Sequence, residues 1–351
     1  MERLNAAHSL SGLVLNEKWK VLKEIESYPG ATGGFFSVCY EVQNLETGLI
    51  AFLKALNFEA FFQMFPGKNI VEILYEQTQA YKYERDILLL CKTKRLSKVA
   101  TILDEGEAYL SSFTIPNVPF LIFELAEMDV RNKLSFAKDL DNAWKLQSLH
   151  DIAAGLRQLH SVKISHQDLK PSNVLLYHDS TISKIGDLGR SLCESIHAPH
   201  DNGSFPGDFR YAPPELLYRY YIEDANIRKY ATDCYLFGSL IVFYFIGLNM
   251  TSLLAKNINK DFKWTKWHGA YKEVQSYVLE AFELAINEFK SQIENETLQE
   301  ELGRMVEYLC FPIPEKRGHP RTILLRGSSF NLERFITRLD YLSKKAKYKL
   351  I

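Results

Sequence analysis

The residues with the clearest chemical potential lie in the segment HQDLKPSN, residues 166–173. Asp168 can orient a hydroxyl group or accept its proton, and Lys170, two residues later, can offset the charge of a transferring phosphate. The amide oxygen of Asn173 suits Mg²⁺, which prefers oxygen ligands. Further along the chain, Asp187 in KIGDLGR offers a second metal-binding group, a carboxylate. This combination predicts a site for phosphoryl transfer.

The rest of the chain must position these residues, and its hydrophobic pattern divides it into two parts. The first part, from about Trp19 to Glu124, holds one strongly helical stretch at residues 71–92 and strand-like runs at residues 19–25, 35–42, 49–56 and 119–125. Beyond Leu125 the apolar residues follow long helical periods, and residues 197–215 are rich in Pro and Gly, which predicts a long irregular loop. We therefore expect an α+β fold of two segregated lobes. The expected boundaries are residues 17–125 for the strand-rich N-lobe and 126–343 for the helical C-lobe, with terminal extensions at residues 1–16 and 344–351.

The composition of the 351-residue chain is that of an ordinary globular protein, with 46% hydrophobic and 24% charged residues. Its formal net charge of −1 argues against nucleic acid or a membrane as a partner. The five scattered cysteines include no CxxC pair, which indicates buried thiols in a reducing compartment. The N-terminus lacks a signal-peptide pattern, and the apolar run at residues 236–247 is too short for a membrane span. We expect a cytoplasmic protein in which this run is a buried core helix.

At this point the sequence resembles the protein kinase family, over roughly residues 17–343. HQDLKPSN is similar to the catalytic loop of the family, DLG at residues 187–189 to its metal-binding motif, and YAPPELL to the end of its activation segment. Asp233 matches the aspartate that anchors the catalytic loop, and Arg317 matches the arginine that pairs with Glu215. These matches occur in the order of the family, whereas an HxD pattern alone would also fit small-molecule kinases.

The resemblance implies a two-lobed protein kinase-like fold and transfer of the γ-phosphate of ATP to a protein substrate. The implied metal is Mg²⁺, with Mn²⁺ as a substitute. Asp168 and Lys170 would be catalytic, while Asn173 and Asp187 would hold the metal. The lysine at position 170 and the layout of GDFRYAPPE are typical of the serine/threonine branch.

The resemblance also assigns residues to ATP binding. Lys54 would hold the α- and β-phosphates, positioned by Glu84, with Glu76 as a weaker candidate for that pairing. The long separation between Lys54 and Glu84 indicates an insertion at residues 57–70. The other assignments are phosphate contacts by Gly33 and Gly34, an adenine sandwich between Val38 and Leu175, and hinge backbone groups at Glu124 and Leu125, next to Phe123 as the gatekeeper.

Among the residues that depart from the family pattern, three bear most directly on activity. Gln167 replaces an arginine that usually binds a phosphate on the activation segment, and a neutral amide cannot do so. Activity would then be constitutive or controlled by a partner. Phe52 stands where a small alanine normally faces adenine, so it would crowd that space unless the strand slides by one residue and presents Ala51. Asp208 replaces a threonine and could pair with Lys170, repel Asp168 or favour a basic substrate residue.

Several alternatives stay open at this level. Taken alone, Lys54 and Glu84 are interpreted as solvated surface residues, and His166 as a core histidine rather than a base. The crowding by Phe52 favours a pseudokinase scaffold without turnover, and a small-molecule kinase is a third hypothesis. The long helical region at residues 270–310 predicts either a docking surface for a regulatory partner or a larger lobe core. For residues 330–350, a final packed helix is favoured over a basic membrane-binding helix.

Overall fold

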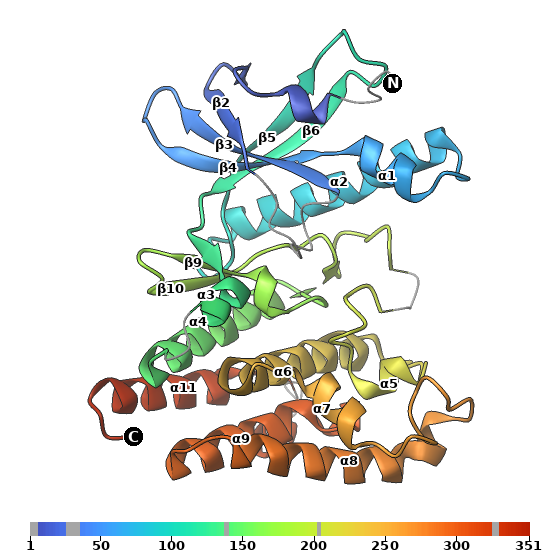
Figure 1. Cartoon of the computed structure of the whole chain (residues 1–351), viewed down its shortest axis with the longest axis vertical. Coiled ribbons are helices and arrows are strands. Elements are labelled where there is room, and N and C mark those ends of the chain that lie inside the picture. The colour runs from blue at the N-terminus through green and yellow to red at the C-terminus, as the bar shows by residue number, and fades with distance from the viewer. Residues whose placement is uncertain (1–5, 26–35, 137–139, 202–204, 325–329) are drawn as a thin grey trace. The chain divides into compact units, whose positions relative to one another are not determined.

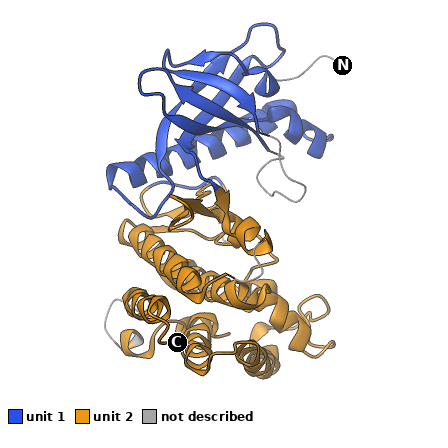
Figure 2. Cartoon of the chain, turned by 60° about the vertical axis from the view of Figure 1, so that its left-hand side comes forward, with its two compact units in different colours: residues 1–127, 196–199 blue, residues 128–195, 200–351 orange. Residues whose placement is uncertain are grey.

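The computed structural model describes residues 6–25, 36–136, 140–201, 205–324 and 330–351. It divides into two compact units, which Figure 2 shows in different colours. Unit 1 comprises Met1–Glu127 with Ile196–Pro199, and unit 2 comprises Met128–Ser195 with His200–Ile351. Strands dominate unit 1 and helices dominate unit 2, so the predicted α+β class with two segregated lobes is confirmed.

Unit 1 is built on a six-stranded antiparallel sheet with the strand order β1-β2-β3-β4-β6-β5 (Figure 1). The sequence pattern predicted β2, β3, β4 and β6 but neither β1 nor β5. In β5 the side chains do not alternate between buried and exposed, so the strand lacks the period-2 signal on which the prediction depends. The strands are β1 (Val14–Leu15), β2 (Trp19–Glu24), β3 (Ser37–Asn44), β4 (Ile50–Leu56), β5 (Ile102–Tyr109) and β6 (Asn117–Glu124).

One face of this sheet forms the core of unit 1 together with the N-terminal segment. Ala6, Ala7 and Leu10 are fully buried against the strands, and the Tyr40 hydroxyl donates a hydrogen bond of 2.6 Å to the carbonyl oxygen of Ala7. The prediction placed residues 1–16 outside the lobe as an extension. That is corrected here, because the described part of this segment is packed into the core and contributes strand β1.

Two helices complete unit 1: α1 (Phe58–Met64) and α2 (Ile70–Thr93). Helix α2 begins after Asn69, whose side chain accepts a hydrogen bond of 2.8 Å from the Val71 amide and so caps the first turn. Helix α1 lies within the predicted insertion at residues 57–70 and directly precedes α2 in the chain. The 24 residues of α2 carry Glu84 in their second half.

Unit 2 is mainly helical. Helix α4 packs against α11, and α6 packs against α9 (Figure 1). The final segment is therefore a packed helix as predicted, and it extends to Lys347, beyond the expected lobe boundary at residue 343. The helices are α3 (Val130–Phe136), α4 (Asn142–Ser161), α5 (Pro214–Leu217), α6 (Thr232–Ile246), α7 (Met250–Asn257), α8 (Tyr271–Ser291), α9 (Glu296–Cys310), α10 (Pro320–Ile323) and α11 (Glu333–Lys347).

Short strands and helical turns position the segment at residues 166–173. The chain leaves β8 at Ser165, passes through the loop and a 3-10 turn, and enters β9 at Val174. Strand β9 lies between β7 and β10, whereas β8 pairs with β11. These strands are β7 (Met128–Asp129), β8 (Ile164–Ser165), β9 (Val174–Tyr177), β10 (Ile182–Ile185) and β11 (Leu192–Cys193), and the short helices are η1 (Ala7–Ser9), η2 (Pro171–Asn173), η3 (Ile227–Ala231) and η4 (Pro314–Lys316).

The apolar run predicted to be a core helix is α6. Most of its side chains are buried inside unit 2, including the fully buried Phe237 and Ile241. Within the described residues, no single helix has the length and apolar character needed to cross a membrane. The pair Ile227–Ile246 and Met250–Asn257 meets these criteria by length and composition when taken together, across a bend of 83°.

Candidate functional site

Three polar groups converge on the carboxylate of Asp168. The Lys170 ammonium donates to Oδ2 at 2.8 Å, and the Asn173 amide donates to the same oxygen at 3.1 Å. The other oxygen, Oδ1, accepts a hydrogen bond of 2.8 Å from the backbone N–H of Asp208. Asp168 is only 7% exposed, so these contacts fix the carboxylate in one orientation. The structure thus brings Asp168, Lys170 and Asn173 into one cluster.

The loop before Asp168 is tied to the start of α6 through Asp233. The carboxylate of Asp233 accepts hydrogen bonds from the backbone N–H groups of His166 at 2.8 Å and Gln167 at 2.9 Å. His160 also contacts it, at 2.8 Å through Nε2. These bonds hold Gln167 in a left-handed conformation, with φ of 65°, which non-glycine residues rarely adopt. Asp233 therefore shapes the loop, as the resemblance implied.

The side chain of Gln167 takes part in the same network. Its amide nitrogen donates to the Lys229 carbonyl oxygen at 2.8 Å and lies 3.3 Å from Oδ1 of Asp233. Gln167 is 2% exposed, so its amide is committed to these internal contacts.

His166 is a structural residue, in agreement with the interpretation of this histidine as part of the core. It is fully buried, and its Nδ1 accepts a hydrogen bond of 3.2 Å from the Asp168 backbone N–H. The proton is then on Nε2, which donates to the Gly186 carbonyl oxygen at 3.0 Å. Both ring nitrogens are occupied, which leaves His166 no role as a base.

Asn173 and Asp187 meet at one end of the β9–β10 hairpin. The backbone N–H of Gly186, next to Asp187, donates to the Asn173 carbonyl oxygen at 2.8 Å. The Asn173 Nδ2 donates to Asp168, so its Oδ1, which accepts a hydrogen bond of 3.4 Å from the Ser172 hydroxyl, is the amide atom that can also bind a cation. Within the described residues, no three His, Cys, Asp or Glu side chains form a metal-binding group. One amide oxygen and one carboxylate nevertheless fit Mg²⁺, which keeps several waters or phosphate oxygens as ligands.

In unit 1 the Lys54 ammonium binds both carboxylate oxygens of Glu84, at 2.9 and 3.1 Å. The two side chains come from the central strand β4 and from α2, and they are 28% and 12% exposed. Glu76, the weaker candidate, pairs instead with Lys68 at 2.7 Å. The structure therefore selects Glu84 as the partner of Lys54.

The strand register decides which residues share a face with Lys54. Residues directly opposite each other in an antiparallel pair point to the same side, and Lys54 is paired with Cys39. Phe52, two residues before Lys54, also lies on this side, and its ring centre is 6.5 Å from that of Phe123. Ala51 is buried in the core on the opposite side. The strand has therefore not slid to present Ala51 in place of Phe52.

The prediction that Val38 covers adenine is wrong. Val38 is paired with Ala55, and both belong to the buried core on the face opposite Lys54. Cys39 occupies the position on the Lys54 face. Burial raises the pKa of its thiol to about 11, against the opposing effect of the Lys54 charge, so the group stays a neutral thiol near neutral pH.

The other residues assigned to nucleotide binding are placed as follows. The Glu124 backbone N–H already donates to the Thr101 carbonyl oxygen at 3.2 Å, and its side chain accepts from the Thr101 amide at 2.9 Å. Leu125 follows the end of β6 and is 39% exposed. Leu175 is half-buried in β9. Gly33 and Gly34 lie outside the described residues.

Asp208 lies beside the cluster of Asp168, Lys170 and Asn173 and has two basic neighbours. The Arg210 guanidinium binds its carboxylate through two nitrogens, at 2.7 and 3.0 Å, and the Lys170 ammonium is 3.8 Å away. Burial alone would raise the pKa of Asp208, but the hydrogen bonds from Arg210 and the nearby positive charges lower it below its usual range. Asp208 is therefore charged at neutral pH.

Two further contacts hold the segment after residue 205 in place. Gly207 lies so close to the catalytic loop that a Cβ atom would collide with the Gln167 carbonyl oxygen and stand 2.6 Å from the Phe205 ring. Glu215 forms an ion pair with Arg317 at 2.6 Å, and both side chains are fully buried. The predicted pairing of Glu215 with Arg317 is confirmed.

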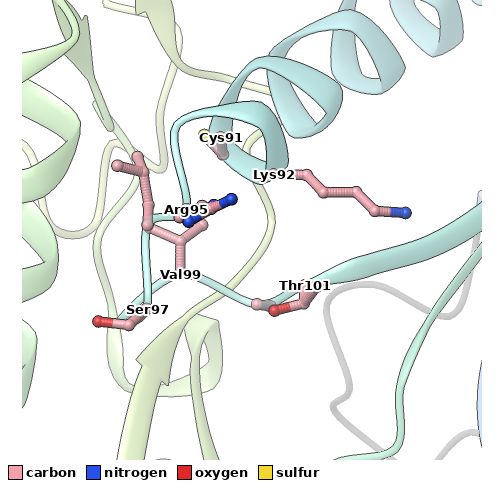
Figure 3. Close-up of a pocket in the computed structure, with 8 residues that line it drawn as sticks. Cys91, Lys92, Arg95, Ser97, Val99 and Thr101 are labelled. Atoms are coloured by element: carbon pink, nitrogen blue, oxygen red, sulfur yellow. The ribbon is translucent and has the colours of Figure 1, made fainter.

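A cavity of about 250 Å³ lies at the turn after α2, away from these residues in the sequence (Figure 3). Lys92, Arg95 and Thr101 are among the residues that line it. The Lys92 ammonium donates to the Leu103 carbonyl oxygen at 3.0 Å. Since this cavity contains none of the candidate residues, we do not assign it to the catalytic site.

The sequence model described as "Protein kinase domain" matches residues 32–325. The chain belongs to the protein kinase family. The match includes the cluster of Asp168, Lys170 and Asn173, the Lys54–Glu84 pair and the Glu215–Arg317 pair.

Curated relatives of this kinase have modest identity. Inhibitor of nuclear factor kappa-B kinase subunit alpha from Xenopus tropicalis is 29% identical over 199 residues, which is 53% of this chain and 23% of that protein. Serine/threonine-protein kinase PTK2 from Candida glabrata is 27% identical over 237 residues, or 59% of this chain and 28% of that protein. Mitogen-activated protein kinase MPS1 from Pyricularia oryzae is 23% identical over 227 residues, which is 64% of this chain and 49% of that protein. The kinase thus spans less than half of the length of these relatives.

Sequence reasoning missed three residues that the structure places beside the candidate site residues: Cys39, Gly207 and Arg210. For Cys39, counting back from the turn between β3 and β4 gives the pairing with Lys54 only once the register of that turn is known from the structure. For Gly207 the sequence shows a glycine but not the carbonyl oxygen against which it packs. Arg210 lies two residues after Asp208, yet only the folded loop shows that it turns back onto that carboxylate.

Proposed function

We propose that this kinase transfers the γ-phosphate of Mg·ATP to serine or threonine hydroxyls of a protein substrate. The observation that carries the proposal is the fixed carboxylate of Asp168, which Lys170, Asn173 and the Asp208 amide hold in one orientation. A positioned carboxylate beside a lysine suits a reaction in which orientation and charge stabilisation supply most of the rate. The names of relatives such as PTK2 support serine and threonine as acceptors.

Each catalytic residue has a distinct role in this proposal. Asp168 orients the acceptor hydroxyl and accepts its proton through the carboxylate that the loop holds still. Lys170, 8% exposed, carries its positive charge beside this carboxylate and stabilises the charge of the transferring phosphate.

The remaining site residues serve the nucleotide and its metal. Asn173 through Oδ1 and Asp187 through its carboxylate would hold Mg²⁺, and Mn²⁺ has the same preference for oxygen ligands. When bound, the metal offsets negative charge on the phosphates. Lys54, oriented by Glu84, would bind the α- and β-phosphates. Leu175 and, in place of Val38, Cys39 are the proposed contacts of the adenine ring.

The position of Gln167 supports activity that is not switched by a phosphate on the activation segment. Its amide is buried and bonded to Lys229 and Asp233, and it has no charge to attract a phosphate. We expect phosphatase treatment to leave the rate unchanged within about twofold. A loss of most of the activity after dephosphorylation would contradict this part of the proposal.

The direct test is incubation with γ-labelled ATP and Mg²⁺, read by intact mass and peptide mapping. We expect label on serine or threonine with the natural chain and none with Asp168→Ala. Asp261→Ala, which removes an exposed aspartate from unit 2, is the matched control and should retain the label. Transfer to small alcohols but to no protein would instead support a small-molecule kinase.

One observation favours a pseudokinase scaffold as a second candidate. Phe52 remains on the Lys54 face, where it would meet the base of a nucleotide. Melting temperatures with and without Mg·ATP separate the two, because a ligand that binds only the folded state must raise the transition. No shift in the natural chain together with a clear shift in Phe52→Ala would support the scaffold. A shift in both would support the kinase.

The regulatory partner expected at residues 270–310 remains a proposal for the outward side of α8. The inward side is lobe core, since Val274, Val278 and Phe282 are all buried. Outward, Leu284 is 48% exposed and neighbours Glu283 at the rim of a groove of about 370 Å³ between α8 and α9. Leu284→Lys with Glu283→Lys should lower partner association or change activity. If neither partner association nor activity changes, the proposal of a regulatory partner at α8 is wrong.

We also propose a cytoplasmic location. All five cysteines are free thiols, as expected in a reducing compartment. Microscopy of the chain fused to a fluorescent protein tests this proposal.

A further inference from the structure

The catalytic cluster contains one more acidic group than its lysine can neutralise. The Lys170 ammonium is 2.8 Å from the Asp168 carboxylate and 3.8 Å from that of Asp208. The second positive charge comes from Arg210, which reaches Asp208 from two residues along the same loop. Without Arg210, two carboxylates would share one ammonium group close to where a negatively charged phosphate has to bind.

The position of the Asp208 carboxylate is fixed by its backbone. Its N–H donates to Oδ1 of Asp168 at 2.8 Å, and the preceding Gly207 packs directly on the Gln167 carbonyl oxygen. Asp208 therefore belongs to the rigid part of the site, and its side chain is only 13% exposed.

Arg210 differs from Asp208 in that it is held loosely. Its side chain is 71% exposed, and the hydrogen bonds that hold it run to Asp208. Because most of the Arg210 side chain lies in solvent, another cation can replace it at the Asp208 carboxylate. A guanidinium or ammonium group from a bound peptide has the right charge to do so.

We propose that Asp208 selects acceptor hydroxyls with a basic side chain next to them in the substrate, by exchanging Arg210 for that side chain. This inference rests on the proposed protein kinase function and adds the substrate class. Asp168 and Asp208 share Lys170 as a partner, so their carboxylates are separated by no more than two ion-pair lengths. An extended peptide advances about 3.3 Å per residue, which places the basic residue one or two positions from the acceptor.

The exchange keeps the charge of Asp208 neutralised during phosphate transfer. The incoming cation takes over from Arg210 on the substrate side, so Lys170 stays with Asp168 and is not drawn toward a second carboxylate. A contact that holds the substrate next to Asp168 in the transition state raises kcat/KM.

The test uses serine peptides that differ only in the residue beside the serine, which is Arg, Ala or Glu, placed on either side. We expect kcat/KM to be about tenfold higher for Arg than for Ala in at least one series, the factor for one charge-assisted hydrogen bond. In Asp208→Asn the Arg and Ala peptides should have kcat/KM values within about twofold of each other, because a neutral amide does not attract the basic side chain, whatever the effect on the overall rate. Arg210→Ala should raise the ratio, because the substrate no longer has to displace an arginine.

The matched control is Arg157→Ala, which removes another exposed arginine from unit 2, one that pairs with Glu333 at 2.8 Å. It should leave the ratio unchanged. A ratio near one in the natural chain, a preference for Glu, or a lost preference in Arg210→Ala would each overturn the inference while leaving the kinase function intact.

Direct binding tests the same surface without turnover. The peptides are made with alanine in place of the acceptor serine, and their dissociation constants are measured by fluorescence anisotropy in the natural chain and in Asp208→Asn. Tighter binding of the Arg peptide, lost in Asp208→Asn, supports the inference even if no phosphate is transferred. Equal affinities, or no binding of the Arg peptide at millimolar concentration, overturn it. Failure of the kinase function would appear separately, as no label transfer to any acceptor.

Discussion

Two ion pairs in different parts of this kinase have similar distances but opposite surroundings. In unit 2, Arg317 and Glu215 are 2.6 Å apart and both fully buried. In unit 1, Lys54 and Glu84 are 2.9 Å apart and remain 28% and 12% exposed. Arg317 also donates to the carbonyl oxygens of Phe311 and Ala231, so each of the three guanidinium nitrogens donates a hydrogen bond within the fold.

The difference indicates which pair can serve chemistry. A fully buried pair cannot change partners without leaving a charge in a low-dielectric interior. A partly exposed ammonium group can accept a phosphate in place of its carboxylate at a modest cost in stability. The buried pair should therefore determine folding, and the exposed pair should determine activity. Four substitutions test this contrast, in order of their expected effect on stability.

The largest effect is expected for Arg317→Met. Removal of one partner leaves the Glu215 carboxylate buried without its partner, and the free energy of unfolding should fall by about 3–5 kcal/mol. Urea unfolding followed by circular dichroism measures this. Glu215→Leu combined with Arg317→Met should recover part of the loss. If the double variant is less stable than the single one, the pair itself stabilises the fold and the argument from the unpaired charge is wrong.

Gly207→Ala shows whether a close contact without charge has an intermediate effect. The added Cβ would collide with a backbone oxygen, that of Gln167, which cannot rotate away. We expect a stability loss of about 1–3 kcal/mol, typical of overpacking, and a marked loss of activity because Asp208 and Asp168 shift apart. Gly67→Ala is the control, since a Cβ there has open space. Equal stability and activity of the two variants would mean that the loop accommodates the methyl group.

Lys54→Met should separate activity from folding. We expect the free energy of unfolding to change by no more than about 1 kcal/mol, because the pair is partly solvated. Activity should fall by about 100-fold or more, the scale of losing one electrostatic contact that positions the phosphates for transfer. Phosphate transfer and urea unfolding are measured on the same sample. A large stability loss with activity retained would reverse the contrast with Arg317.

The smallest effect is expected for Lys344→Ala on α11. Lys344 pairs with Asp340 one turn earlier at 2.7 Å, and the two side chains are 66% and 39% exposed. Such helix pairs contribute about 0.3–0.5 kcal/mol, and salt should screen the contribution. Thermal unfolding at low salt and at 1 M salt measures this. A loss comparable to that of Arg317→Met would show that burial is not what separates the ion pairs.

The prediction from sequence succeeded where residues that act together are near one another in the chain or carry a regular pattern. Asp168, Lys170 and Asn173 fall within six residues, so a single loop brings them together. Helix α2 was predicted because its apolar residues recur with the helical period over a long stretch. Strand β5 was missed because its side chains do not alternate between buried and exposed. The N-terminal segment was missed because a few small apolar residues have no periodicity.

The assignment of Val38 failed for a geometric reason. Successive residues of a strand point to opposite faces, so an alignment error of one residue moves a side chain from the site to the core. Only the hydrogen-bond register of β3 with β4 shows that Cys39 is the residue beside Lys54. Of the two carboxylates considered for Lys54, only the structure shows that Glu84 is within reach and that Glu76 is engaged by Lys68.

The amino-acid sequence by itself determined the kinase family, the two-part organisation and the order of the catalytic residues, because these depend on short spacings and local periodicity. The tertiary structure alone decided the sheet face of Phe52 and Cys39, the internal hydrogen bonds of Gln167 and the ion pair of Arg210 with Asp208. Each of these depends on which atoms from separate segments come within about 3 Å, the range of hydrogen bonds and ion pairs. Such distances are set by strand register and packing, which act on the folded chain as a whole.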